Sequence, residues 1–254
     1  MNIAVCVKQV VTRDWPLRVN ESAEWVRDHD ASFEMNEPDA YALEEALRLK
    51  EQHGGEVVVC VAGPPRVTQV IREALARGAD RAIHVQHEQL AFADANVVAS
   101  SLATAMLPEQ FDLVLTGLQS DDQGFGQTGV ILAERLGLPH ATIVMEVDAG
   151  GVTGIRVKRE LEGGWFQWVG MPTPALLTIQ SGINQLRYAT LKGIMAAKRK
   201  EVRSVEPEGL QPAGQHIVRL YVPEKEKATR FIEGSPEAAS RVLVRLLCEE
   251  ARVL

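Results

Sequence analysis

Residues 56–62, EVVVCVA, form a run of β-branched and small apolar residues after a single glutamate. A strand with one wet face alternates polar and apolar residues, whereas a continuous apolar run is typical of a strand buried on both faces of a parallel sheet. The run ends at Gly63-Pro64-Pro65, a turn signal. It therefore predicts a central strand with helices packed on both sides.

The segments around this strand alternate between helix and strand, which indicates βαβ units. Apolar residues at helical spacing predict helices at residues 39–52, 67–77 and 93–106. Short apolar runs predict strands at residues 3–7, 81–85, 111–115 and 175–179. Glycine-rich turns separate three strands expected to be antiparallel, at residues 142–147, 151–161 and 165–169. The predicted fold class is α/β: a doubly wound, mostly parallel sheet with a small antiparallel addition.

The C-terminal part of the chain has a different character. Residues 201–234 have little periodicity and several prolines and glycines, as expected of an extended arm. Ser235 is a plausible cap and Pro236 suits the first turn of a helix over residues 235–252. We expect an α/β domain over residues 1–200, and an arm and helix over residues 201–254. Residues 10–34 are expected to be irregular.

Composition bounds the class of protein. The 254 residues carry a formal net charge of -7, which argues against nonspecific binding to nucleic acid. No apolar run approaches the roughly 20 residues that span a bilayer, and the N-terminus lacks the pattern of a secretion signal, so a cytoplasmic location is expected. The three cysteines have no zinc-ligand spacing, and Cys6 and Cys60 lie in apolar runs that predict buried thiols. No metal site is predicted.

A loop rich in glycine, amide and acid residues, GLQSDDQGFGQTGV (117–130), lies between a predicted strand and a predicted helix. Ligands of open α/β sheets bind beyond the carboxyl ends of the strands, and N–H groups at a helix N-terminus attract anions. The loop matches neither the Walker pattern nor GxGxxG. It is either a nucleotide site or a glycine-rich helix entry without a ligand. The candidate residues are Gly117, Asp121, Asp122, Gln123, Gly124, Phe125, Gly126, Gln127, Thr128 and Gly129.

Two features of this loop region leave alternatives open. Asp121 and Asp122 are awkward beside a phosphate, and could cap a turn, contact a ribose hydroxyl or hold a cation. Other loops at the same sheet edge should converge on a real site, among them Lys8 and Gln9 and the segment before the first helix. In that segment Asn36 is either a helix cap, a site residue or both.

Six segments together resemble the β (small) subunit of electron transfer flavoproteins. The resemblance covers roughly residues 1–205. The final segment is the most specific, because its tyrosine-to-lysine run has no generic structural explanation. The segments are VCVKQV, MNEPDAYALEEALRLKE, VAGPP, REALARGADRAIHV, DLVLTGLQSDDQGFGQTG and LRYATLKGIMAAKRKEV.

The resemblance implies an adenine-nucleotide-binding, Rossmann-like fold and a heterodimer with a larger α subunit that holds most of the FAD. It implies an arm and helix that pack on the α subunit, and an AMP of structural role. The complex would carry electrons from flavoprotein dehydrogenases, such as acyl-CoA dehydrogenase, to a quinone oxidoreductase or a similar acceptor. The β subunit would have no catalytic residues of its own.

Carried over residue by residue, the AMP site implied by the resemblance includes Gln127 and Thr128 as the phosphate-contacting pair. It also includes the glycine-rich loop and Cys6, Asn36, Glu37, Pro38 and Ala62. The loop departs from the commonest family pattern where Gly124 and Gly126 stand, so backbone N–H groups must supply more of the phosphate contact. A branch of the family that bifurcates electrons holds a second FAD in place of AMP, and the QTG sequence here favours AMP.

The resemblance also assigns surfaces toward other molecules. Arg13 and Pro38 fall where many relatives place aromatic residues against the flavin ring, so either the flavin environment is altered or the irregular segment is misaligned. Leu191 would be an exposed anchor for a dehydrogenase, whereas an ordinary core residue would be buried. The implied partner-binding residues are Arg187, Tyr188, Leu191, Ile194, Met195 and Lys198.

Two rival classes share the expected fold. A stand-alone, ATP-binding stress-type protein would need no partner, and the arm after residue 200 and the LRYATL segment argue against it. An adenylating enzyme would carry a pyrophosphate loop after the first strand, where Lys8-Gln9-Val10-Val11 offers nothing of the kind. No acid–base pair and no nucleophile with a positioned base stands out.

Overall fold

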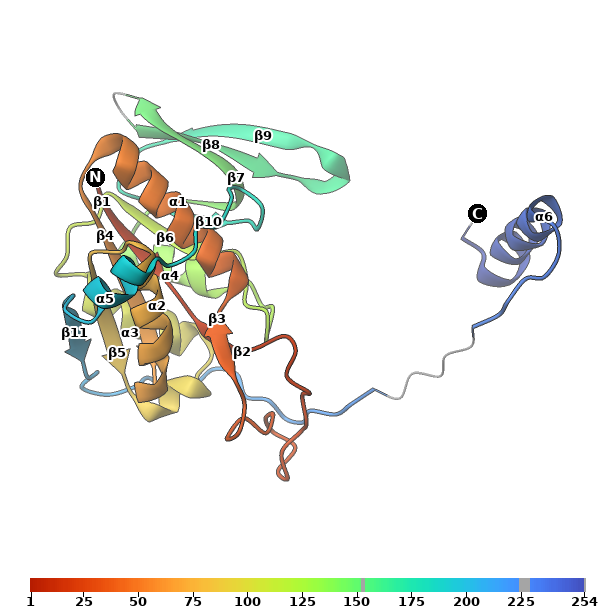
Figure 1. The fold of residues 1–254 in the computed structure, drawn as a ribbon, viewed down its shortest axis with the longest axis horizontal. Helices are drawn as coiled ribbons and strands as arrows, with labels where there is room; N and C mark the ends of the chain where they lie inside the picture. Colours follow the sequence, from red (N-terminus) through yellow and green to blue (C-terminus); the bar gives the residue numbers. More distant parts are fainter. Residues whose placement is uncertain (152–153, 224–228, 254) are drawn as a thin grey trace.

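The computed structural model describes residues 1–151, 154–223 and 229–253, and its centre is a large sheet (Figure 1). Neighbouring strands run parallel from β11 through β7, and the last two are antiparallel. The predicted α/β class, a mostly parallel sheet with an antiparallel addition, is confirmed. The described strands lie in the order β11 (Val202–Val205), β5 (Arg81–Gln86), β4 (Glu56–Gly63), β1 (Asn2–Cys6), β6 (Leu113–Gly117), β10 (Ala175–Ile179), β7 (His140–Gly151), β8 (Gly154–Glu160) and β9 (Phe166–Met171).

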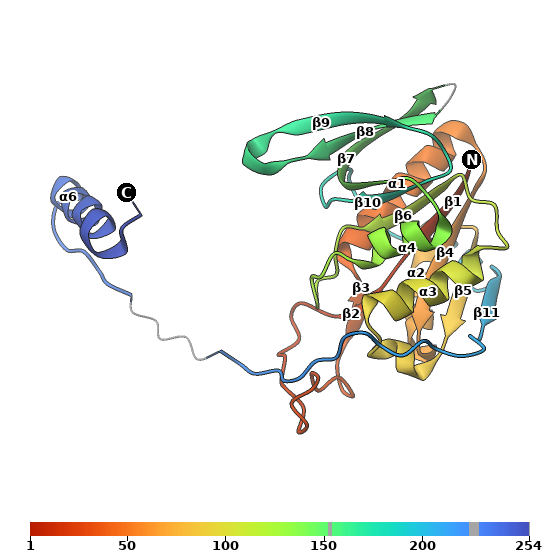
Figure 2. The same ribbon diagram turned by 180° about the vertical axis from the view of Figure 1, so that it is seen from behind.

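Helices cover both faces of the parallel part of the sheet. Helices α1 (Glu37–His53) and α2 (Thr68–Arg77) lie on the face shown in Figure 1, with α5 (Leu191–Ala197) beside α2. Helices α3 (Ala95–Met106) and α4 (Thr128–Leu136) lie on the opposite face (Figure 2). Short 3-10 turns occupy Pro65–Val67, Glu88–Ala91 and Glu162–Gly164. No helix within the described ranges is long and apolar enough to cross a membrane.

The side-chain alternation of the strands explains this double layer. Ile3 and Val5 of β1 belong to the core beneath α1 and α2, whereas Ala4 and Cys6 belong to the core beneath α3 and α4. Because both faces are covered, both sets of side chains must be apolar. Residues 57–61 of β4 are fully buried, so the interpretation of EVVVCVA as a central strand is confirmed.

The N-terminal loop contains more regular structure than its sequence predicts. Strand β2 (Gln9–Val11) pairs antiparallel with β3 (Phe33–Met35), and an isolated bridge joins Val19 to Val26. The expectation of an irregular segment over residues 10–34 is therefore wrong at its two ends. Three-residue strands are too short to show a period of two. Val10 and Met35 are both buried, and they pair with Glu34 and Gln9 of the opposite strand.

The C-terminal segment begins with a strand instead of an irregular arm. Strand β11, within the range expected to lack periodicity, pairs parallel with β5 at the sheet edge. Arg203 holds it there, because its guanidinium donates to the backbone oxygen of Ala105 at 3.0 Å and to Glu109 at 3.0 Å. These partners lie more than 90 residues away in the sequence, so no local pattern announces the strand.

Helix α6 (Pro236–Leu246), which continues as a π-helical turn at Leu247–Ala251, stands clear of the sheet and its helices (Figures 1 and 2). The Ser235 hydroxyl accepts a hydrogen bond from Ala238 N at 3.3 Å, which confirms the predicted cap. No residue of α6 is buried, and apolar Leu243 and Val244 remain about half exposed. The helix therefore has an apolar side without a partner in the described chain.

Deleting residues 229–254 should leave the thermal melting of the isolated chain unchanged, since α6 buries nothing against the sheet. Differential scanning calorimetry of the full-length and shortened chains provides the comparison. The shortened chain should also aggregate less on heating, because an exposed apolar helix face is removed. A melting temperature lower by several degrees would show that α6 packs on the domain in solution.

Candidate functional site

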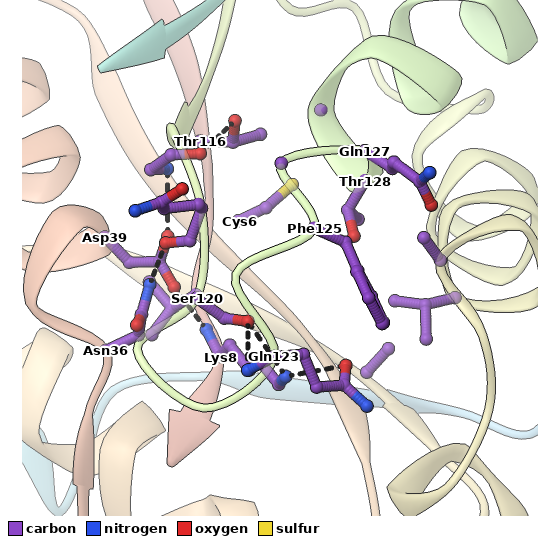
Figure 3. Close-up of a pocket in the computed structure, with 18 of the residues that line it drawn as sticks. Cys6, Lys8, Asn36, Asp39, Thr116, Ser120, Gln123, Phe125, Gln127 and Thr128 are labelled. Carbon is purple, nitrogen blue, oxygen red and sulfur yellow. Dashed lines mark hydrogen bonds between the residues drawn. The ribbon is translucent and has the colours of Figure 1, made fainter. Parts of the chain in front are cut away.

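A cavity opens at the carboxyl edge of the parallel strands, where β1, β4 and β6 end (Figure 3). Its empty volume is about 900 Å³, including space open to solvent at the mouth. The ends of these strands, the first turn of α1, the loop after β6 and the N-termini of α3 and α4 surround it. Ligands of doubly wound sheets bind at this edge, so the cavity lies where a nucleotide site was predicted.

The structure brings most of the predicted nucleotide-binding residues to this cavity. The lining includes Cys6, Asn36, Ala62, Gly117, Gln123, Phe125, Gly126, Gln127, Thr128 and Gly129. The other predicted residues lie beside the cavity, outside its lining: Glu37, Pro38, Asp121, Asp122 and Gly124.

The buried carboxylate of Asp39 holds the cavity floor together. Its two oxygens accept the backbone N–H of Lys8, at 2.8 Å, and of Gly117, at 2.9 Å, so one side chain of α1 joins the ends of β1 and β6. Only 6% of the residue is exposed, and this burial raises the pKa of Asp39 to about 7 although the two N–H donors oppose it. Sequence reasoning missed this residue, because an acid in a helical first turn is usually explained by the helix dipole.

Asn36 fastens the glycine-rich loop to the start of α1. Its Nδ2 donates to the backbone oxygen of Gln119 at 3.0 Å, and its Oδ1 accepts the N–H of Asp121 at 2.8 Å. Asn36 is the N-cap residue of α1, as predicted, but its side chain makes no capping hydrogen bond. Asp121 supplies the missing acceptor from the loop, since its Oδ2 accepts the N–H of Glu37 at 3.1 Å.

The two loop acids, Asp121 and Asp122, lie outside the cavity lining, and each is paired with a cation. Asp122 accepts a hydrogen bond from Lys8 Nζ at 2.7 Å, and the same ammonium group reaches Ser120 and Gln123, each at 3.3 Å (Figure 3). The Arg13 guanidinium lies 3.5 Å from Asp121 and pairs with Glu37. The acids therefore shape the loop, which answers the objection that they would repel a phosphate.

The N-terminus of α4 faces the cavity without a side-chain cap. Gln127 is its cap residue and makes no capping hydrogen bond. Gly124 and Gly126 have φ of +68° and +62°, a conformation that other residues rarely adopt, so they set the turn before the helix. The first N–H groups of a helix have no partner within it, so the N-terminus of this nine-residue helix can attract an anion such as a phosphate.

An apolar wall faces the glycine-rich loop across the cavity. It comes from the turn after β5 and from α3, and sequence reasoning missed all of it. Its residues are Leu90, Ala91, Ala93, Ala95, Val98 and Leu102. The position of the turn after a parallel strand could have revealed it, because every such turn reaches the same sheet edge. An apolar slot beside an anion site suits the adenine ring and the phosphate of one mononucleotide.

Two of the three cysteines are buried, and the acidic side chains of the described residues form no cluster for a metal ion. Burial raises the pKa of Cys6, which lines the cavity, and raises the pKa of Cys60 to about 12, and both shifts favour the protonated thiol. The predicted burial of these two thiols is confirmed, and Cys248 is exposed. Across the part of the chain that the structure describes, no group of three or more His, Cys, Asp or Glu residues is arranged to hold a metal ion.

The fold and the cavity define the class of α/β proteins with a doubly wound sheet and a cavity at the carboxyl edge of its parallel strands. A family model described as "Electron transfer flavoprotein domain" matches residues 24–210. The chain is 36% identical to the electron transfer flavoprotein subunit beta of Methylophilus methylotrophus, covering 98% of both chains, and 33% identical to that of Bacillus subtilis, covering all of both. The mitochondrial protein of that name from Oryza sativa subsp. japonica is 36% identical, again over the full length of both. The chain belongs to the electron transfer flavoprotein β-subunit family.

Gly117→Ala should destabilise the chain, because a Cβ there would lie 2.4 Å from Asp39 Oδ1 and 2.7 Å from the Pro38 Cβ. Forcing a methyl group into a packed site typically costs about 1–3 kcal/mol. Unfolding by urea measures the change. Gly170→Ala is the control, since nothing lies within 4 Å of its Cβ position. An equal effect of the two substitutions would show that Asp39 and Pro38 can move to make room for the methyl group at little cost in stability.

Proposed function

We propose that this chain is the β subunit of a heterodimeric electron transfer flavoprotein. With an α subunit it would share an FAD, accept electrons from flavoprotein dehydrogenases and pass them to a quinone oxidoreductase or similar acceptor. Membership of the family over the whole chain is the observation that carries this proposal. In that complex the FAD would supply the redox chemistry, and the residues of this chain would bind and position the cofactors.

The cavity at the sheet edge would hold AMP. Its geometry supports this proposal, because an uncapped helix N-terminus at Thr128 faces it from one side and an apolar wall from the other. Lys8 adds a positive charge to the lining. The Gln127-Thr128-Gly129 sequence favours AMP over the second FAD of a bifurcating complex.

Acid release of the ligands from the purified complex with its α subunit should yield one FAD and one AMP. Thr128→Val preserves the shape of the side chain and removes a hydroxyl donor, which typically costs about 1.5–3 kcal/mol when the acceptor is charged. This variant should release less AMP and the same amount of FAD. Two flavins and no AMP from the parent complex would instead assign the chain to the bifurcating branch.

The C-terminal arm and α6 would pack on the α subunit. Asp94 Oδ2 accepts the N–H of Gly214 at 2.6 Å, and the N–H of Leu220 reaches Ala23 O at 2.6 Å, so the first part of the arm lies on the domain. Beyond these contacts the arm exposes large apolar residues that a partner could cover: Tyr221, Val222, Phe231, Leu243 and Val244. A stand-alone nucleotide-binding protein has no use for such a surface.

Residues 187–197, which we name the anchor segment, would dock a donor dehydrogenase. Tyr188, Leu191 and Met195 are 90%, 83% and 65% exposed, so Leu191 is not an ordinary core residue. Ile194 and Lys198 are exposed beside them. Arg187 instead binds Glu44 and Glu51 of α1, and its part in docking would be to hold the segment.

Leu191→Ala should slow electron transfer from an acyl-CoA dehydrogenase that reduces the parent complex, with FAD content, dithionite reduction and melting unchanged. Burying a leucine side chain contributes about 1.5–3 kcal/mol, which corresponds to roughly a ten- to hundredfold loss in kcat/KM. Leu107→Ala is the matched control, because Leu107 is 63% exposed at the end of α3 on the opposite face of the sheet. A lower melting temperature with a normal kcat/KM would rule out the anchor role.

A further inference from the structure

The anchor segment keeps its position with very little apolar burial. Helix α5 has seven residues, and Ala197 is the one buried side chain in it. A helix this short is not stable by itself, so contacts with the rest of the domain must define it. Leu191 and Met195 of this helix are 83% and 65% exposed, so they contribute little to holding it in place.

Gly193 allows α5 to touch the end of α2. A Cβ on this residue would lie 2.2 Å from the backbone oxygen of Ala76, closer than any real contact. The φ of Gly193 is not in the left-handed region, so the glycine is needed for space and not for its conformation. Any larger residue must lift α5 away from α2, and Leu191 with it.

Two cations cap the facing ends of these helices reciprocally. Arg72 of α2 donates to the backbone oxygens of Ala197, at 2.7 Å, and of Lys200, at 3.2 Å. Lys200 Nζ donates in turn to the oxygens of Leu75, at 2.9 Å, and Ala79, at 2.5 Å. The last carbonyl groups of a helix lack partners within it, so each cation stabilises the end of the other helix and joins the two.

Arg187 holds the start of the anchor segment through two carboxylates of α1. Its guanidinium donates to both oxygens of Glu44, at 2.8 and 2.9 Å, and of Glu51, at 2.6 and 3.2 Å. Glu44 is buried, and bidentate pairs of this kind fix direction as well as distance. The segment is thus clamped to α1 at one end and to α2 at the other.

We propose that Gly193 and Arg72 are positioning residues for partner docking: they hold α5 so that Leu191 faces outward in one place before the partner arrives. Holding a binding segment in its bound conformation lowers the entropy cost of association, which otherwise weakens a small transient interface. Neither residue needs to touch the partner. The inference rests on the proposed docking role of the anchor segment and adds the residues that set its geometry.

The test uses the complex with its α subunit and an acyl-CoA dehydrogenase that reduces the parent complex. Gly193→Ala should raise the KM for the dehydrogenase about tenfold, with kcat, FAD content and dithionite reduction nearly unchanged. Gly170→Ala is the matched control, because its Cβ would meet nothing within 4 Å. Arg72→Gln, which loses at least one of the two carbonyl contacts, should shift KM in the same direction and serves where Gly193→Ala fails to assemble.

The double variant Gly193→Ala/Leu191→Ala decides whether the glycine acts through the leucine. A KM no higher than that of Leu191→Ala alone supports the proposal, since contacts that act through one another are not additive. A full additional loss, or a Gly193→Ala complex with the KM of the Gly170→Ala control, overturns it and leaves the docking role of Leu191 intact. If Leu191→Ala itself has no effect on KM, both the docking role and this inference fail.

Discussion

The carboxylate of Asp39 is the contact on which the cavity at the sheet edge depends. It receives the N–H of Lys8 and of Gly117 at the ends of β1 and β6, where the two central strands leave the sheet. Strand ends of a parallel sheet have N–H groups that no neighbouring strand can satisfy, and a buried unsatisfied donor costs about 1–3 kcal/mol. Because Asp39 lies in the first turn of α1, satisfying these donors also places Asn36, which then fixes the glycine-rich loop. A single buried group thus orders three sides of the cavity.

The charged side chains around the cavity form ion pairs with one another. Two groups of ion pairs lie around the loop: Lys8 with Asp122, and Arg13 with Glu37 and Asp121. Partly exposed ion pairs of this kind contribute little to the stability of the fold. They matter because they turn the loop acids away from the cavity and keep a lysine beside it. The helix N-terminus at Thr128 faces the cavity, and Asp39 is the one acidic residue among the described residues of the cavity lining. Because the pKa of Asp39 is raised to about 7, its carboxyl group is partly protonated near neutral pH.

The two proposed binding surfaces differ in how they are prepared. The cavity is already formed in the structure of the chain alone, and its shape follows from the packing of the helices on the two faces of the sheet. The anchor segment and α6 carry exposed apolar residues instead, and an exposed apolar group is useful only when a partner covers it. For the anchor segment, polar contacts to α1 and α2 replace the apolar burial that usually positions a helix.

The amino-acid sequence by itself determined the α/β class, the parallel central strand over residues 56–62 and the place of the glycine-rich loop. These follow from local periodicity and from turn residues, which act over a few positions. Only the tertiary structure decided that the Asn36 side chain binds the loop while a carboxylate oxygen of Asp121 accepts the first N–H of α1. It also decided that Val202–Val205 is a strand and that Leu90 and its neighbours form a cavity wall. The physical reason is distance along the chain: Asn36 and Asp121 are 85 residues apart, so their hydrogen bond exists only once the sheet has brought them together.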